Sequence, residues 1–183
     1  MATKTLLTIE QYNALEEPTG VRYELDRGEL VVTPSLMPRH NIICGELHGH
    51  LNAWARKHNL GQAIYEVDVK LAEDTVRRPD VMFIRRERMK AVDLDQVPVQ
   101  VVPDLVVEVV SKHDQPDDLM LKVRQYLRSG VRAIWVLYPK TREAYCYAPN
   151  ALQPTVLDAE RGDKLEEPDL LPGFSLPLSE VLP

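Results

Sequence analysis

The sequence predicts an α/β fold built on a mixed β-sheet flanked by helices. Residues 102–138 contain two buried apolar runs separated by an amphipathic helix. A strand–helix–strand crossover of this kind joins parallel neighbours. Residues 143–158 then give two short runs, EAYCYA and PTVLDA, which are typical of antiparallel strands that extend a sheet. Parallel and antiparallel pairs together make the predicted sheet a mixed one.

Length and composition indicate one soluble, cytoplasmic domain over residues 1–183. The net charge of −6 gives no general attraction to nucleic acid or to an anionic membrane, so any polyanion site must be a local basic patch. Cys44 and Cys146 are too few for a disulfide scaffold or a thiolate zinc site, and we expect two buried free thiols. No apolar run approaches the roughly 20 residues of a membrane span. The N-terminus also lacks the apolar core of a signal peptide.

The N-terminal part of the chain suggests two helices, a hairpin and a strand. Thr8, with Gln11 three residues later, forms a capping box that begins a short helix. RYELDRGELVV is typical of a hairpin around the turn 26–28. Residues 39–58 keep apolar side chains at helical spacing, which predicts an amphipathic helix. Residues 62–72 alternate and predict one half-exposed strand.

The second half of the chain supplies the centre of the predicted sheet. After a polar connection over 86–100, residues 102–111 are apolar on both faces and should form the central strand. In the helix that follows, Asp114 is the expected N-cap and Gly130 the expected stop. AIWVLYP is a second buried strand, and the apolar, Pro-rich tail should pack back on the body.

Two acids interrupt strands that are otherwise apolar. Asp80 opens the run DVMFI, and Glu108 lies inside VVEVV. A buried carboxylate is costly unless it is paired or bound to a metal, and two close carboxylates also repel each other. Mg²⁺ or Mn²⁺ relieves both costs, because these ions prefer oxygen ligands. The alternative is a structural pair, with Glu108 bridged to an arginine of RRPD.

Lys122 is a third candidate. It lies at the edge of the apolar stripe of its helix, so its stem can follow the core while its amine reaches the end of the sheet. An amine there would offset charge that develops on a phosphate. The alternative is a surface lysine with no role in a site.

Several strings then occur in a recognisable order: YELDRGELV, His40 at the start of a helix, RPDVMFI, PDLVVEVVS, Lys122 with Tyr126, GVRAIWVLYP and LPGFSLPLSEVL. This order resembles the Uma2 family, also known as the DUF820 restriction endonuclease family, within the PD-(D/E)XK nuclease superfamily. The resemblance runs from about residue 8 to residue 180.

The resemblance implies a restriction-endonuclease-like fold and a metal-dependent nuclease site. Pro79 and Asp80 match the PD of the superfamily motif, and Glu108 matches its second acid, so Asp80 and Glu108 would be the metal ligands. The motif lysine is missing, because Val110 stands two residues after Glu108. Lys122 on the next helix would supply the amine instead.

Two further residues join the predicted catalytic set. Glu24 matches a family acid near the first hairpin and would contact the metal or water; its alternative is a hairpin salt bridge. His40 extends the stripe of Ile43 by one helical step, so it should face inward. It would hydrogen-bond a phosphate or orient Glu24, or it is a core histidine.

The predicted function is a Mg²⁺- or Mn²⁺-dependent endonuclease that hydrolyses DNA phosphodiester bonds. The alternative is a nuclease-fold protein that binds nucleic acid or a protein partner without cutting. DNA would meet a local basic patch, for which the candidates are Arg77, Arg78, Arg85, Arg86 and Arg88; the alternative is that these arginines form a solvated edge. We also expect a homodimer, paired through the strand edges EAYCYA and PTVLDA.

Overall fold

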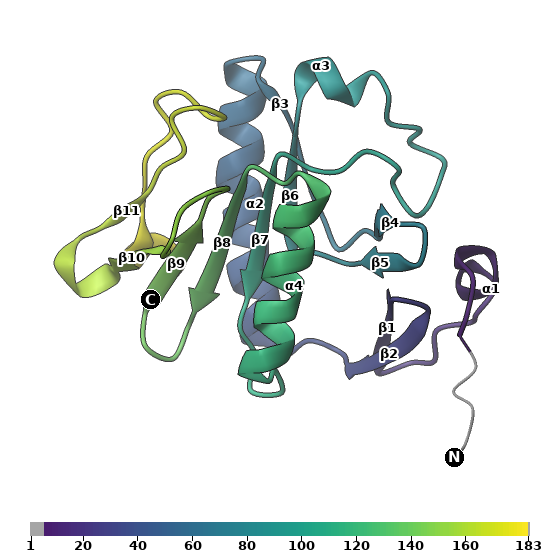
Figure 1. The fold of residues 1–183 in the computed structure, drawn as a ribbon. Helices are drawn as coiled ribbons and strands as arrows, with labels where there is room; N and C mark the ends of the chain where they lie inside the picture. Colours follow the sequence, from purple (N-terminus) through teal and green to yellow (C-terminus); the bar gives the residue numbers. More distant parts are fainter. Residues whose placement is uncertain (1–5, 183) are drawn as a thin grey trace.

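The computed structural model describes residues 6–182, and its strands form a six-stranded, a four-stranded and a two-stranded sheet (Figure 1). The six-stranded sheet has the order β10-β9-β8-β7-β6-β3 and comprises β3 (Gly61–Tyr65), β6 (Val81–Arg85), β7 (Leu105–Val109), β8 (Ala133–Tyr138), β9 (Glu143–Tyr147) and β10 (Thr155–Asp158). The four-stranded sheet has the order β2-β1-β5-β4 and comprises β1 (Val21–Asp26), β2 (Glu29–Pro34), β4 (Val69–Ala72) and β5 (Thr75–Arg77).

The remaining elements are the small third sheet and the helices. The third sheet pairs β11 (Lys164–Leu165) with β12 (Leu176–Pro177). The helices are α1 (Ile9–Asn13), α2 (Pro38–Lys57), α3 (Arg86–Met89), α4 (Pro116–Ser129), α5 (Leu178–Val181) and the 3₁₀ turn η1 (Ala159–Arg161). No helix within residues 6–182 is long and apolar enough to cross a membrane.

The predicted parallel pair at the centre of the sheet is confirmed. β7 and β8 run parallel, with Leu105 opposite Ala133 and Val109 opposite Leu137. α4 forms the crossover between them, and every residue of β7 is buried. The strand reads as a continuous apolar run because helices cover both of its faces. The mixed α/β fold class is therefore confirmed, with β9 and β10 antiparallel as expected.

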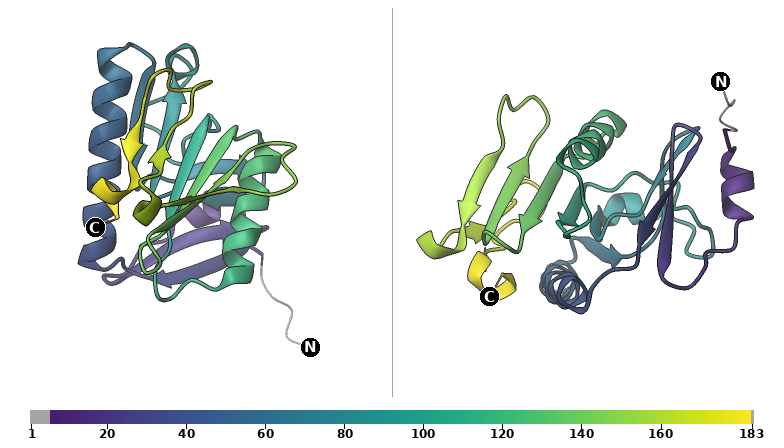
Figure 2. Two further views of the ribbon diagram at one scale, coloured as in Figure 1. Left: turned by 90° about the vertical axis from the view of Figure 1, so that its left-hand side faces the viewer. Right: turned by 90° about the horizontal axis from the view of Figure 1, so that it is seen from below.

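The two faces of the six-stranded sheet are covered by different helices (Figure 2). On one face, Leu47 of α2 packs in a cluster with Phe83 and Trp135. On the other face, Val123 of α4 packs with Val106. Alternate residues of β7 and β8 supply the two clusters, as the pleat of a strand requires. Each such fully buried side chain contributes about 1.5–3 kcal/mol to stability.

The ends of α4 explain where this helix is placed. Pro116 occupies the first turn, where a missing N–H has no cost, and Gly130 closes the helix with φ +102°. The expected N-cap was wrong by one residue, because Gln115 holds that position without a side-chain cap. Asp114 instead accepts the backbone N–H of Ser111 at 2.6 Å, so it closes the loop between β7 and α4. At the other end of the chain, the predicted capping box of α1 is confirmed.

The expected single strand over 62–72 is two strands in two different sheets. β3 pairs with β6 in the six-stranded sheet, and β4 pairs with β5 in the four-stranded sheet. The chain breaks at Glu66, whose φ of +58° is incompatible with an extended strand. The predicted hairpin is confirmed, since β1 and β2 pair up to Asp26 opposite Glu29, with Arg27 and Gly28 at positive φ in the turn.

Candidate active site

A pocket of about 260 Å³ brings together side chains from both large sheets and from two helices. All the residues predicted to be catalytic line it: Glu24, His40, Asp80, Glu108 and Lys122. We call this the central pocket. Glu24 comes from β1, His40 from α2, Asp80 from the residue before β6, Glu108 from β7 and Lys122 from α4. Their catalytic and metal-binding roles stay predictions.

The register of two antiparallel strands sets the position of Asp80. Val81 of β6 lies opposite Val107 of β7. Because the strands are antiparallel, Asp80, which precedes Val81, lies beside Glu108, which follows Val107. Asp80 is buried, and its Oδ2 accepts the backbone N–H of Val109 at 2.7 Å. Its Oδ1 lies 3.8 Å from Nη1 of Arg22. Asp80 is therefore fixed by the neighbouring strand and only loosely paired with a cation.

His40 contacts Asp80 and does not orient Glu24 as expected. Its Nε2 lies 3.1 Å from Asp80 Oδ2, and its Nδ1 lies 3.3 Å from Sγ of Cys44, one helical turn later. Burial lowers the pKa of His40, but the hydrogen bond and the charge of Asp80 outweigh it, so the pKa lies above its ordinary value. His40 thus holds the Asp80 carboxylate from the α2 side.

Glu108 is a buried acid with an unfavourable charge. Its Oε1 accepts the Tyr126 hydroxyl at 2.6 Å. Burial, and then the negative charges of Asp80 and Glu24, raise the pKa of Glu108 to about 8 despite the opposing charge of Lys122. The pocket therefore favours a bound proton or another cation at this carboxylate.

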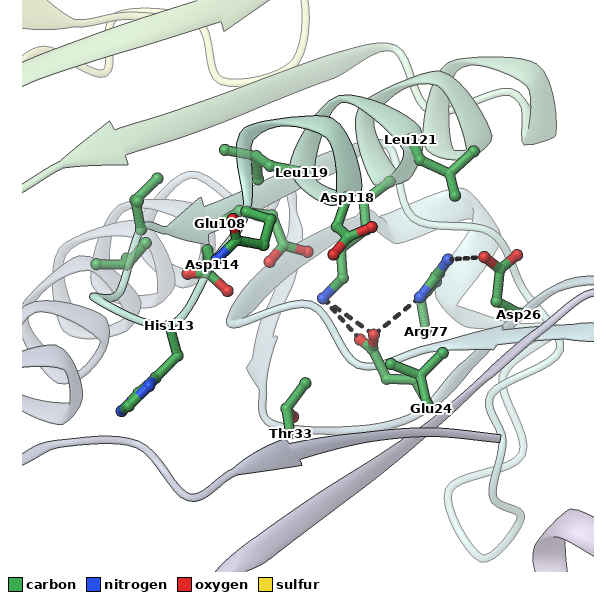
Figure 3. Close-up of a pocket in the computed structure, with 15 residues that line it drawn as sticks. Glu24, Asp26, Thr33, Arg77, Glu108, His113, Asp114, Asp118, Leu119 and Leu121 are labelled. Atoms are coloured by element: carbon green, nitrogen blue, oxygen red, sulfur yellow. Dashed lines mark hydrogen bonds and ion pairs between the residues drawn. The ribbon is translucent and has the colours of Figure 1, made fainter. Parts of the chain in front are cut away.

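Glu24 and Lys122 form a half-buried ion pair at the side of the central pocket. Figure 3 shows the neighbouring pocket that shares both residues with it, with the contact between Glu24 and Arg77 dashed. Nζ of Lys122 lies 3.0 Å from a carboxylate oxygen of Glu24, which also pairs with Nη1 of Arg77 at 3.0 Å. Burial raises the pKa of Glu24, but Lys122 and Arg77 outweigh it and hold the pKa below its ordinary value. Burial conversely lowers the pKa of Lys122, but Glu108 and Glu24 raise it above its ordinary value. The raised pKa keeps the amine protonated. The alternative of a salt bridge within the hairpin is not what Glu24 forms, because its cationic partners lie on β5 and α4.

The donor set fits a hard divalent cation. Asp80 and Glu108 offer carboxylate oxygens on adjacent strands, and both line the central pocket. Their mutual repulsion contributes to the raised pKa of Glu108, which a divalent ion between them would relieve. Glu24 already accepts bonds from Lys122, Arg77 and the backbone N–H of Arg78, so it is less suited to bind an ion.

The five candidate arginines form two groups at opposite ends of β6, and their role as a DNA-binding patch stays a prediction. Arg77 and Arg78 precede β6 and are held in ion pairs with acids of neighbouring segments. Arg85, Arg86 and Arg88 lie at or beyond the opposite end of β6, where Arg85 and Arg88 share one buried aspartate. A strand rises about 3.3 Å per residue, so the two groups are separated by at least ~13 Å.

Sequence reasoning missed several residues that support the site. Tyr126 was assigned to the apolar stripe, although it follows Lys122 by four residues and so lies on the same helical face. Arg22 precedes Glu24 by two residues on β1, a spacing that places both on one face of the strand. His113 lines the central pocket, and also the neighbouring pocket drawn in Figure 3, from the loop before α4, which no spacing rule predicts.

Comparisons with known proteins agree with this fold. The chain matches the model of the Uma2 family, described as "Putative restriction endonuclease", over residues 9–179. The crystal structure of a "putative nuclease belonging to DUF820" from Anabaena variabilis matches with a TM-score of 0.82 at 17% identity, over 96% of this chain and 97% of that one. A cryo-EM structure of a DrdV–DNA complex matches with a TM-score of 0.37 at 20% identity, over 62% of this chain and 67% of that one. No curated protein matches the chain. Because the family match spans most of the sequence, this protein belongs to the Uma2 family.

Proposed function

We propose that this protein is a divalent-metal-dependent endonuclease that hydrolyses DNA, and that residues 1–183 act as one nuclease domain. The observation that carries the proposal is the juxtaposition of Asp80 and Glu108 in one pocket with the charged amine of Lys122. The family description, "Putative restriction endonuclease", supports a nucleic acid as the substrate and favours DNA over RNA.

Asp80 and Glu108 are the proposed ligands of Mg²⁺ or Mn²⁺. When bound, such an ion acts as a Lewis acid toward a phosphodiester oxygen. Asp80 is presented to the ion in a fixed orientation, because the Val109 N–H and His40 both hold its Oδ2. Glu108 loses its proton when it becomes a ligand, since carboxylates bind metals in the charged form.

Lys122 supplies positive charge for the developing charge on the phosphate. It does not act as a general base, because its pKa lies above the ordinary value and the amine keeps its proton. Glu24 is a positioning residue, since it holds the amine and is itself held by Arg77. Lys122 in this way stands in for the lysine that Val110 replaces in the motif.

A second candidate function is nucleic-acid or protein binding without cleavage. It is favoured by the ion pair between the Lys122 amine and Glu24, which are 3.0 Å apart. This pair leaves the amine less available to a phosphate. The ion pairs that neutralise Arg77 and Arg78 act in the same direction by lowering the positive charge near the pocket.

The test is plasmid cleavage with Mg²⁺ or Mn²⁺, combined with calorimetric titration of Mn²⁺. We expect Asp80→Asn and Glu108→Gln to abolish cleavage and to weaken Mn²⁺ binding, because each replaces a charged ligand by a neutral side chain of similar shape. Asp117→Asn, an exposed acid in the first turn of α4, is the matched control and should behave as the wild type. If the wild type cuts neither DNA nor RNA with any divalent ion and binds no Mn²⁺, the binding function replaces the enzymatic one.

A further inference from the structure

A second group of metal-binding side chains lies on the α2 side of Asp80. His40, Cys44 and Asp80 are all buried, and they offer one nitrogen, one sulfur and one oxygen within 4.8 Å of one another. His40 and Cys44 are one helical turn apart on α2, so both project from the same face. The group shares only Asp80 with the proposed Mg²⁺ ligands.

The spacing of the nitrogen and sulfur atoms suits a tetrahedral ion. Zn²⁺ binds nitrogen at about 2.0 Å and thiolate sulfur at about 2.3 Å, which separates two tetrahedral ligands by about 3.5 Å. Nδ1 of His40 and Sγ of Cys44 are already 3.3 Å apart. Oδ2 of Asp80 lies 3.1 Å from Nε2 of the same ring, so this carboxylate is the oxygen donor beside the pair, and it would leave Nε2 to become a ligand of the same ion.

Glu66 adds a second, independent observation beside this group. Among residues 6–182, its buried Oε1 has no hydrogen-bond partner, while its Oε2 lies 2.6 Å from Nη2 of Arg22. Its backbone has the left-handed φ of +58°, a strain that is tolerated where a side chain must be placed. Glu66 and Cys44 both line a pocket of about 730 Å³ that shares Arg22 with the central pocket, and the Cys44 side chain is itself buried at its wall.

We propose that His40, Cys44 and Asp80 form a binding site for a thiophilic divalent ion of the Zn²⁺ class, beside Glu66. The mixed nitrogen, sulfur and oxygen donors distinguish it from the oxygen pair of Asp80 and Glu108, which suits Mg²⁺. When the ion binds, the Cys44 thiol releases its proton to solvent and becomes a thiolate ligand. The expectation from sequence that two cysteines are too few for zinc applied to all-thiolate sites and does not exclude this one.

Occupation of this site has a consequence that rests on the proposed nuclease function. Asp80 cannot offer the same carboxylate fully to both ions, so Zn²⁺ competes with Mg²⁺ for it. The protein would then be inhibited by Zn²⁺ at concentrations that leave Mg²⁺ in excess.

The first experiment titrates the full chain with Co²⁺, which reports sulfur ligation through a thiolate-to-cobalt charge-transfer band in the near ultraviolet. We expect this band in the wild type and in Cys146→Ser, and its loss in Cys44→Ser. Cys146 on β9 is the matched control, since these are the two cysteines of the chain. Absence of the band in the wild type, or a band that follows Cys146, overturns the proposal.

A second measurement keeps the site testable if Cys44→Ser does not fold. In Cys146→Ser loaded with Zn²⁺, X-ray absorption at the zinc edge should show one sulfur neighbour at about 2.3 Å. A shell of oxygen and nitrogen without sulfur overturns the proposal. Failure of the nuclease function gives a different result, because cleavage is then absent while the cobalt band remains.

Discussion

The hydroxyl of Tyr126 on α4 lies 2.6 Å from Oε1 of Glu108 on β7, so the helix that covers the sheet also holds the acid inside it. This bond lowers the pKa of a carboxyl that burial raises. We predict that Tyr126→Phe weakens Mn²⁺ binding by about tenfold, as is usual for the loss of a partner to a metal ligand. Calorimetry measures the affinity.

The matched control for Tyr126→Phe is Tyr147→Phe on β9. Within residues 6–182, the Tyr147 hydroxyl donates only to the weak acceptor Sδ of Met120, at 3.6 Å. Equal Mn²⁺ affinity in both variants would show that Glu108 does not depend on Tyr126.

The buried charge of Glu108 makes stability depend on pH. The unfolded chain loses this proton near pH 4.5 and the folded chain near pH 8, so the folded state binds more protons between those values. The stabilising contribution of the protonated group is complete below pH 4.5 and is lost as pH rises through about 8. We predict that Glu108→Gln, which cannot ionise, gains stability over the wild type as pH rises through this window. Thermal unfolding of both proteins in EDTA gives the difference, and a constant difference across the window contradicts the raised pKa.

Lys122→Ala should lower the cleavage rate by about 10²-fold, which is typical of removing one group that stabilises transition-state charge. Mn²⁺ binding should persist, because the amine faces Glu24 and is not an ion ligand. Lys112→Ala, an exposed lysine in the loop after β7, is the control and should retain the wild-type rate. Single-turnover cleavage at saturating metal separates the two effects, and equal rates in both variants would remove Lys122 from the mechanism.

Two glycines should respond oppositely to alanine. A Cβ at Gly61 would lie 2.1 Å from the carbonyl oxygen of Ile84 on the paired strand β6, so Gly61→Ala should cost about 1–3 kcal/mol or more. Gly49 on α2 has open space around it, and Gly49→Ala should stabilise the helix by about 0.5–1 kcal/mol. Denaturant unfolding measures both changes, and a stable Gly61→Ala would argue against the close β3–β6 pairing.

The homodimer stays a prediction, now confined to a single edge. β9 pairs with β8 and β10, so it has no open edge, whereas β10 is the outer strand of the six-stranded sheet. Light scattering at micromolar concentration should detect a dimer, and Val156→Lys on β10 should dissociate it, because a charge on an edge strand opposes pairing. A monomer in the wild type would reject the prediction.

The fold was predictable where a continuous apolar run indicates that both faces of a strand are buried. The run around Glu108 and the helix after it require a parallel partner, and β8 is that partner. The break at Glu66 was not predictable, because its polar side chain fits the alternation of 62–72 while its backbone φ is +58°. The alternation of polar and apolar residues predicts which face of a strand each side chain lies on. It does not predict where the backbone stops being extended.

The members of the candidate site were predictable, and their partners were not. Asp80 and Glu108 stand out because acids are rare in buried strands. That His40 contacts Asp80 instead of Glu24 depends on how α2 crosses the sheet, which no spacing within the sequence determines. The division of the candidate arginines into two groups was not predictable for the same reason, since nearness in sequence does not show that they lie at opposite ends of β6.

The division of residues 62–72 between two sheets means that the central pocket is lined from two separate sheets. The acids proposed to bind metal belong to β7 and to the start of β6 in the larger sheet, whereas Arg22 and Glu24 belong to the hairpin of the smaller sheet. Changes in the length or sequence of that hairpin can reshape what the pocket admits while the larger sheet stays as it is. An exchange of β1–β2 that keeps Glu24, and with it the contact to the Lys122 amine, would alter one wall of the pocket and leave its two acids in place.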